Sequence, residues 1–519
     1  MAILLTLITG CRDEADYLRN YGQNDYLNFA EAEKSYANQF DALWTALNCN
    51  YALWDYEEAC GLDWDKVYTD YMPKFRELDE RDSTLEISNE EVEALYKEAF
   101  SPLHDGHLYI QVKNLSKGDF IDIRPNYYRN MAREDYDLGI GWHSEPVMSD
   151  TGDDSSLSEY HVASTLASDV LKPLGEKAYH YARQQADSLE ALRQMTNLDS
   201  FRLEGFLRAR EDFRDFIDLT SDKRVEAVYQ ELRDRYSYLD PQLLLPVYES
   251  YGDEAMRACA GRFSDGIVYL NFNQFSWSCY LGLDLTKTPA ACSEASAMML
   301  KKVWLWWYDT IATLKDSGRL KGVVFDLRSN GGGYNNDFQY LLGALLPPGG
   351  IDVGWQRFKT GTGRLDYSPL MPAHFPSLGD PDPDGEDTSD GGGFKPLAID
   401  EPIVVLTNCW TVSMSEITAA AVKLLPNGCQ IGTTSWGGFC SLIPSPESYS
   451  FNYSSAVGVR DMTCFYANIP ATVTTTIDHQ YVDGNGLVPD IIVPLDRDLY
   501  AQGHDTQLAR ALQYIRTGQ

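Results

Sequence analysis

The stretch from Ile403 to Ile417 constrains the fold more than any other part of the chain. It opens with five apolar or β-branched residues, crosses a short polar turn, and continues with a helical pattern that begins at Ser413. A buried strand followed by a tight turn and a helix is typical of an α/β sheet. A serine at the helix start is exposed and lies in a positive field, so Ser413 is a candidate nucleophile. Ser413 and Glu416 also have the spacing of a helix capping box, which is the structural alternative.

The same alternation extends from about residue 260 to the C-terminus. Strands are predicted at 266–272, 322–328 and 402–407, and helices at 298–314, 338–346 and 413–425. Connections of this kind predict an α/β fold with a mostly parallel sheet. We therefore assign residues 256–519 to one α/β core.

The N-terminal part follows a different pattern. Apolar and aromatic residues recur at helical spacing from Phe40 to Trp54, which predicts a helical domain over 31–115 that ends in a turn and a strand at 103–112. Residues 116–255 are also predicted to be largely helical, without an assigned role. The many Trp and Tyr residues leave a sugar-binding surface as an alternative function, but aromatic residues at helical spacing more often form a core.

Charge excludes one class of partner. The 519 residues carry 77 acidic and 43 basic side chains, a formal net charge of −34. Nucleic acid is not an expected partner because no basic stripe is present to neutralise phosphates. A solvated acidic surface accounts for this charge.

The first eleven residues resemble the end of a bacterial lipoprotein signal. An apolar run is followed by Ile8-Thr9-Gly10-Cys11, which has the form of a lipobox. This resemblance implies that residues 1–11 are the signal, that Cys11 carries the lipid, and that 12–30 form a tether. It also implies a lipid anchor in the bacterial cell envelope as the only membrane attachment. A frayed apolar terminus is the alternative.

Cysteines and an acidic loop leave further possibilities open. Removing Cys11 from the ten cysteines leaves nine, so at least one thiol is free or intermolecular. Possible disulfides are Cys279 with Cys292 and some pairing among Cys409, Cys429, Cys440 and Cys464. Alternate Asp residues in 379–391 resemble the first half of a calcium loop, but the closing Glu is missing, and an acidic surface loop is the alternative.

A glycine triplet follows the strand at 322–328. Gly331, Gly332 and Gly333 at the C-terminal end of a strand allow backbone N–H groups to converge. An oxyanion hole needs such donors, with Gly332 and Gly333 as candidates and the Met414 N–H as the second donor. A flexible turn is the alternative.

His107 is the candidate base. It follows Asp105-Gly106 directly before a strand, where an imidazole projects from a rigid edge. Neutral imidazole is the usual base for a serine nucleophile near neutral pH. An exposed loop histidine is the alternative.

Together these segments resemble the C-terminal-processing (tail-specific) and tricorn-core serine peptidases. The resemblance is carried by Asp326-x-Arg328-x-Asn330 with the glycine triplet, by 411–417 around the serine, by 103–107, and by 478–490. The tricorn-like branch fits better, because Gly438 stands where the processing branch has its lysine. In that branch a Ser often precedes the His, where this chain has Gly106, and Asp483 replaces the expected Glu.

This resemblance implies a ClpP/crotonase-like core and a serine endopeptidase that forms an acyl-enzyme. Ser413 would be the nucleophile, His107 the base, and Asp483 the residue that orients the imidazole, directly or through another group. No metal or organic cofactor is expected, and the partner would be a peptide or protein substrate. The alternative is a non-catalytic ligand- or peptide-binding member of the same fold. The oligomeric state is left open.

Overall fold

A computed structural model describes residues 27–82, 86–134, 250–251, 254–255, 258–263, 265–281, 294–360, 363–380, 394–442, 456–470, 472–496 and 505–519. The chain divides into two compact units. Unit 1 comprises 1–136, 352–373 and 436–486, and unit 2 comprises 137–351, 374–435 and 487–519. Both units are therefore built from segments that lie far apart in the sequence, unlike the contiguous division into 31–115 and 256–519.

Unit 1 begins with helices. They are α2 (Phe29–Ala32), α3 (Tyr36–Asn50), α4 (Trp54–Ala59), α5 (Trp64–Asp82), α6 (Asn89–Phe100) and α7 (Pro125–Met131). Two starts are explained by serine caps. Ser35 accepts a bond from the Asn38 N–H, and Ser88 forms a complete capping box with Glu91.

The aromatic residues of these helices form the core of unit 1. Phe40, Tyr51 and Trp54 are buried, and Phe40 stacks on Phe75 with ring centroids 4.4 Å apart. This favours the core interpretation over a sugar-binding surface.

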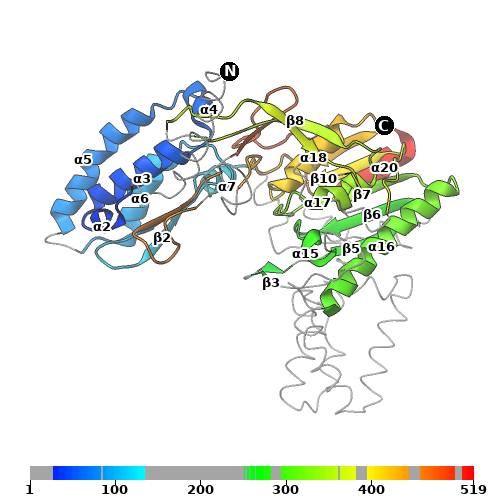
Figure 1. The fold of residues 1–519 in the computed structure, drawn as a ribbon, viewed down its shortest axis with the longest axis horizontal. Coiled ribbons are helices and arrows are strands. Elements are labelled where there is room, and N and C mark those ends of the chain that lie inside the picture. Colours follow the sequence, from blue (N-terminus) through cyan, green and yellow to red (C-terminus); the bar gives the residue numbers. More distant parts are fainter. Residues whose placement is uncertain are drawn as a thin grey trace, which may run out of the picture. The chain divides into compact units, whose positions relative to one another are not determined.

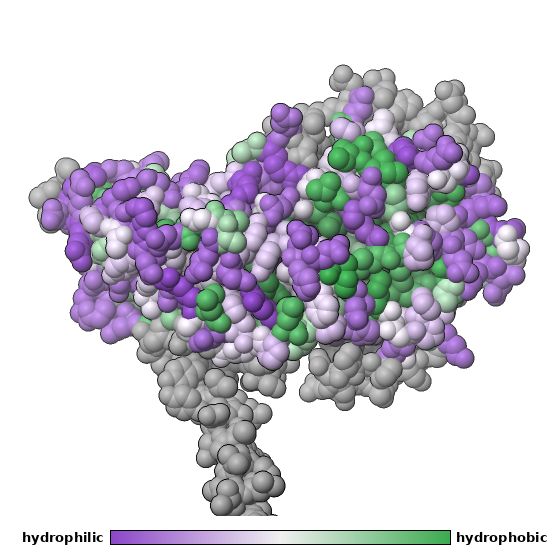
Figure 2. All heavy atoms as spheres, turned by 90° about the horizontal axis from the view of Figure 1, so that it is seen from above, coloured by the Kyte–Doolittle hydropathy of each residue, from purple (hydrophilic) through white to green (hydrophobic). Residues whose placement is uncertain are grey.

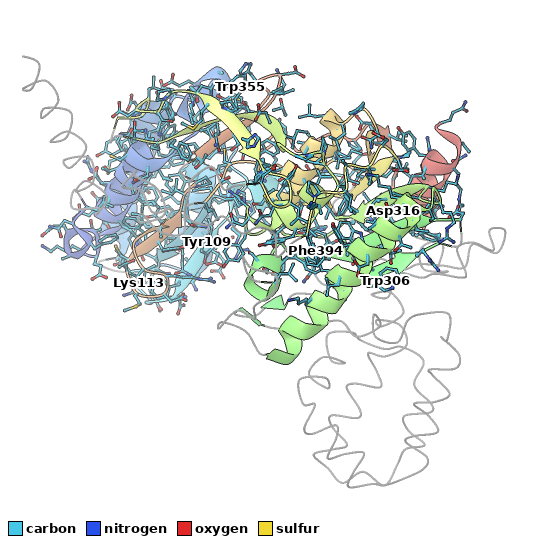
Figure 3. The ribbon with its side chains drawn as sticks, turned by 45° about the vertical axis from the view of Figure 1, so that its right-hand side comes forward. Tyr109, Lys113, Trp306, Asp316, Trp355 and Phe394 are labelled. Carbon is cyan, nitrogen blue, oxygen red and sulfur yellow. The ribbon has the colours of Figure 1, made fainter. Side chains whose placement is uncertain are left out.

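Two sheets complete unit 1. The antiparallel sheet has the order β12 (Ala456–Val457), β13 (Phe465–Asn468), β1 (Tyr109–Lys113), β2 (Phe120–Ile123). The second, with β14 (Thr472–Thr476), β8 (Ile351–Phe358) and β9 (Met371–Phe375), lies largely in this unit. Figure 3 marks Tyr109 and Lys113 at the two ends of β1, and Trp355 on β8. Thus β1 brings the segment after His107 into a sheet with residues more than 300 positions away.

Unit 2 contains the predicted α/β sheet. Its order is β15 (Ile491–Ile492), β11 (Gly428–Gly432), β10 (Ile403–Thr407), β7 (Gly322–Asp326), β6 (Ile267–Phe272), β5 (Ala258–Arg262). All neighbours pair in parallel except β5 with β6. The strands from β10 through β7 and β6 to β5 can be followed in Figure 1. The predicted mixed α/β class with a mostly parallel sheet is confirmed.

Unit 2 also contains several helices. They are α15 (Trp277–Leu281), α16 (Glu294–Asp316), α17 (Asp337–Tyr340), the 3₁₀ helix η2 (Leu342–Ala344), α18 (Met414–Leu424) and α20 (Thr506–Thr517). Two short antiparallel strands, β3 (Ser250–Tyr251) and β4 (Glu254–Ala255), precede the sheet in the sequence. Leu508, Leu512 and Ile515 of α20 pack into a core with Val404 and Val324 of the central strands. Every residue of β6, β7 and β10 is buried, as expected for central parallel strands.

One predicted helix is wrong in its extent. Residues 338–346 form two short pieces, α17 and η2, because Leu341 between them has a non-helical backbone (φ −105°, ψ −98°). The predicted strand at 322–328 also ends early, at Asp326, because Asp326 and Arg328 turn toward each other in a buried ion pair.

Several predictions lie outside the described residues. They concern the lipobox with Cys11, the helices of 135–249, Cys292, and most of the acidic loop 379–391. Within the described part, Cys409, Cys429, Cys440 and Cys464 are buried and form no disulfide bond. No helix there is both long and apolar enough to cross a bilayer. The face shown in Figure 2 is mostly hydrophilic, with apolar residues gathered in patches.

Candidate active site

Ser413 lies in a sharp turn between β10 and α18. Its backbone has φ +60° and ψ −124°, a conformation that a residue with a side chain rarely adopts. Such strain persists only where the surroundings enforce it, and it is concentrated at functional sites. The Ser413 side chain is partly exposed while its neighbours Val412 and Met414 are buried. The turn therefore presents one hydroxyl at the positive end of an eleven-residue helix.

Glu416 fixes this turn through hydrogen bonds of its carboxylate. Its Oε2 accepts the Ser413 N–H at 3.0 Å, so the reach-back bond of the capping box is present. Its Oε1 accepts the Ser435 hydroxyl at 2.5 Å, and Ser435 Oγ in turn accepts the Leu487 N–H at 2.6 Å. Glu416 and Ser435 are both buried, so this chain of bonds fixes the backbone that carries Ser413.

The glycine loop packs against the turn that carries Ser413. Gly332 has φ +83°, and a Cβ added there would lie 2.5 Å from the Ser413 Cβ and 2.9 Å from the Met414 nitrogen. No side chain fits at this position, so the loop and the helix start are in direct backbone contact. The absence of a side chain at Gly332 is what allows this close approach.

The structure separates the roles of the two candidate glycines. The Gly332 N–H donates to Asn330 Oδ1 at 2.9 Å, so it is engaged within the loop, contrary to the expectation that it faces an oxyanion. No hydrogen bond found in the described part of the chain uses the N–H of Gly333 or Met414. These two remain as the candidate donor pair.

Asn330 ties the loop to the helix. Its Oδ1 also accepts the Ser415 hydroxyl at 2.6 Å, its Nδ2 donates to the Phe272 carbonyl at 2.7 Å, and its carbonyl accepts the Val412 N–H at 2.9 Å. The side chain is fully buried. The sequence analysis quoted Asn330 only as part of a motif and missed this role.

Arg328 anchors the same loop. Its guanidinium is buried and donates to Asp326 on its own strand end and to Asp505 before α20, at 2.6 Å to each carboxylate. These two neighbouring carboxylates outweigh the effect of burial and hold the pKa of Arg328 above its usual range. The arginine therefore stays charged, and its ion pairs join the end of β7 to the start of α20.

His107 lies in the turn that leads into β1. The side chain is half-buried, and its Nδ1 atom is covered and has no hydrogen-bond partner in the described part of the chain. Burial lowers the pKa of His107 to about 4, so the imidazole is neutral at neutral pH, as a proton acceptor must be.

Asp483 is fixed beside this turn. Its carboxylate is buried and accepts backbone N–H bonds from Gly106 (3.5 Å), Phe439 (3.2 Å) and Cys440 (3.1 Å). One oxygen of Asp483, one ring nitrogen of His107 and one oxygen of Asp105 lie within 4.8 Å of one another. Burial raises the pKa of Asp483 to about 6, against the lowering effect of the N–H donors.

Asp105 is the residue that the sequence analysis missed here. It is fully buried, and its Oδ1 accepts the N–H groups of His107 at 2.8 Å and Leu108 at 3.1 Å. Burial, and then the charge of Asp483, raise the pKa of Asp105 well above its usual range. The Asp-Gly-His spacing could have indicated this role, because Asp two residues before a backbone N–H is a common turn motif.

The candidate residues thus form two local sets. Ser413, Met414 and the glycine loop belong to unit 2, while His107 and Asp483 belong to unit 1. The structure brings together the members of each set.

Comparisons with known proteins give one matching family and several similar structures. Residues 267–493 match the family described as Peptidase family S41. No curated protein sequence matches the chain. Among solved structures, the chain is similar to a candidate peptidase from Parabacteroides merdae, with 16% identity over 93% of this chain and 97% of that one and a TM-score of 0.44.

Two further structures are similar at low identity. One is mature CPAF complexed with lactacystin, with 12% identity, 94% of this chain and 100% of that chain covered, and a TM-score of 0.45. The other is the photosystem II D1 C-terminal processing protease, with 16% identity, 47% and 50% covered, and a TM-score of 0.27.

Proposed function

We propose that this chain, whose residues 267–493 belong to peptidase family S41, is a serine endopeptidase that cleaves peptide or protein substrates through an acyl-enzyme. The family match supports a peptidase in general. The assignment of individual residues is our inference from the geometry of the two units.

The observation that carries the proposal is the conformation of Ser413. A partly exposed serine with φ +60° stands at the start of α18, and a glycine backbone is packed against it. A capping serine needs neither the strain nor the glycine contact, because caps form readily with an extended backbone, as Ser35 and Ser88 show. We infer that the turn is strained in order to expose a nucleophile.

The proposed reaction is acyl transfer. The Ser413 hydroxyl attacks the peptide carbonyl carbon, His107 accepts the hydroxyl proton, and the same proton passes to the leaving amine. The N–H groups of Met414 and Gly333 would stabilise the oxyanion. Water then hydrolyses the acyl-enzyme by the reverse sequence of proton transfers. This mechanism requires unit 1 to present His107 to the Ser413 hydroxyl.

Asp483 would orient the imidazole and stabilise its protonated form. Its N–H donors fix the carboxylate, and its proximity to His107 is the support for this role. The lipid anchor at Cys11, and with it a location in the bacterial cell envelope, stays a prediction. Incorporation of a labelled fatty acid into the expressed chain, lost in Cys11→Ala, would test it.

A fluorophosphonate probe tests the proposed function on the full chain. Such a probe labels an activated serine, so we expect labelling of the wild-type chain and none of Ser413→Ala. His107→Ala should reduce the labelling rate about 10²–10⁴-fold, because the base is lost. The matched control is Ser317→Ala, which removes an exposed hydroxyl in the same unit that bonds to the preceding helical turn and to the Arg319 side chain.

The outcomes separate the candidate functions. Labelling that persists in Ser413→Ala would place the nucleophile elsewhere. A folded wild-type chain that takes up no probe would favour a non-catalytic binding member of the fold.

A further inference from the structure

The turn at His107 in unit 1 contains two unsatisfied polar atoms. Asp105 Oδ2 and His107 Nδ1 are both covered from solvent, and neither has a hydrogen-bond partner among the residues that the structure describes. Buried polar atoms are rarely left without a partner, since the loss of hydration costs about 1–3 kcal/mol for each. Two such atoms from neighbouring residues indicate a shared ligand.

Asp483 supplies a third possible ligand atom. Asp105, His107 and Asp483 each offer one ligand atom, and these atoms lie within 4.8 Å of one another. Asp105 and Asp483 are fully buried, and their other contacts hold them in place. Asp105 Oδ1 is bound by two backbone N–H groups of its own turn, and Asp483 is bound by N–H groups of three residues. The set is therefore positioned before any ligand binds.

The charges of this set favour a divalent cation. Two carboxylates face each other without a basic side chain among the hydrogen-bond partners found for them, and a 2+ ion would neutralise both. The imidazole selects among cations, because Mg²⁺ and Ca²⁺ prefer oxygen ligands whereas Zn²⁺ binds imidazole and carboxylate together. Zn²⁺ places its ligands about 2.0–2.2 Å away, so the three atoms would have to close from at most 4.8 Å to roughly 3.4 Å.

We propose that Asp105, His107 and Asp483 form a zinc site that inhibits the enzyme when it is occupied. A metal bound to the imidazole takes the lone pair that would accept the serine proton or fixes the ring away from its working position. Three protein ligands leave one position of a tetrahedral ion for water. The metal-binding part stands without the peptidase proposal, and the inhibitory part rests on it.

Metal binding is tested first, in the Ser413→Ala background and with any affinity tag removed. The metal-free full chain is titrated with Zn²⁺ against a chromophoric chelator to obtain the number of tight sites and their affinity. We expect Asp105→Asn and His107→Ala each to lose one tight site, or to weaken it by more than about 100-fold, because each removes a ligand. Asp105→Asn preserves the Oδ1 acceptor of the turn and changes only the unpartnered oxygen.

The control is His479→Ala, which removes an exposed imidazole from the same unit and should leave the number of tight sites unchanged. Equal zinc stoichiometry and affinity in the wild type and Asp105→Asn would overturn the proposal. So would equal competition by Mg²⁺, because the imidazole would then have no part in selection.

Inhibition is tested on the chain with Ser413 intact. We expect Zn²⁺ to suppress fluorophosphonate labelling, EDTA to restore it, and Asp105→Asn to resist suppression at the same Zn²⁺ concentration. Suppression that is identical in Asp105→Asn would overturn the inhibitory role. A chain that takes up no probe even with EDTA would contradict the peptidase proposal instead, and the zinc titration would still decide the site.

Discussion

Gly332→Ala should separate catalysis from folding at the nucleophile turn. A Cβ at Gly332 would lie 2.5 Å from the Ser413 Cβ, 2.7 Å from the Val412 carbonyl oxygen and 2.9 Å from the Met414 nitrogen. Ordinary contacts of a Cβ begin near 3.4 Å, so the loop and the serine must move apart by about 0.9 Å. A misplacement of about 1 Å can cost 10²-fold in rate, and a lost oxyanion donor about 10²–10³-fold.

We therefore expect kcat/KM, or the rate of fluorophosphonate labelling, to fall about 10²–10³-fold. The positive φ of +83° adds strain of about 1–2 kcal/mol for a residue with a side chain, which urea unfolding would measure. The control is Gly318→Ala in the turn after α16. It has φ +65° with nothing within 4 Å of the added Cβ, so it carries the same kind of strain without the contact.

Comparing Gly332→Ala with Gly318→Ala separates the effect on catalysis from the effect on stability. Both should lose stability, but only Gly332→Ala should lose activity. A Gly332→Ala chain that stays folded by circular dichroism and works within about threefold of Gly318→Ala would refute the placement of the glycine loop beside the reacting groups.

Three further predictions follow from buried groups. Arg328→Met leaves two buried carboxylates without their cation and should lower the free energy of unfolding by about 3–5 kcal/mol; a loss below about 1 kcal/mol in urea unfolding would contradict this. Ser435→Ala removes the buried hydrogen bonds to Glu416 Oε1 and from the Leu487 N–H, so we expect a loss of about 1–3 kcal/mol by the same measurement. If catalysis needs an ionised Asp483 and a neutral His107, kcat/KM should rise with pH through a midpoint near 6, which is the pKa of Asp483. In Asp483→Asn this rise should occur at lower pH. A rise at the same pH in both chains would exclude Asp483 as its origin.

Local patterns were sufficient to predict the structure of the turn that carries Ser413. The strand, turn and helix around Ser413 are encoded by neighbouring residues, and β10 and α18 begin and end within one or two residues of their predicted bounds. The glycine triplet was predictable for the same reason, because a turn that admits no Cβ needs glycine whatever the rest of the chain does.

Long-range contacts were not predictable in this way. Asn330 acts through bonds to Phe272, Val412 and Ser415, and Arg328 through Asp505, none of which is near in sequence. The units are discontinuous for a related reason, since β1 pairs with β13 across more than 300 residues. A periodicity shows that a segment has an apolar face, but it does not show which distant segment covers that face.

The three departures from the resembling peptidases lie close together in this structure. Gly106 stands where the tricorn-like branch often has Ser, and a Cβ there would lie 2.0 Å from the Gly437 carbonyl oxygen and 2.3 Å from the Gly438 Cα. The turn at His107 can therefore lie directly on the backbone of Gly437 and Gly438, the segment where the processing branch has its lysine. This close approach brings the Gly106 N–H to within 3.5 Å of Asp483, whose side chain is one methylene shorter than the expected Glu. A shorter acid can reach this turn because the absence of a side chain at Gly106 lets the two backbone segments come closer, which is consistent with a retained orienting carboxylate rather than a lost one.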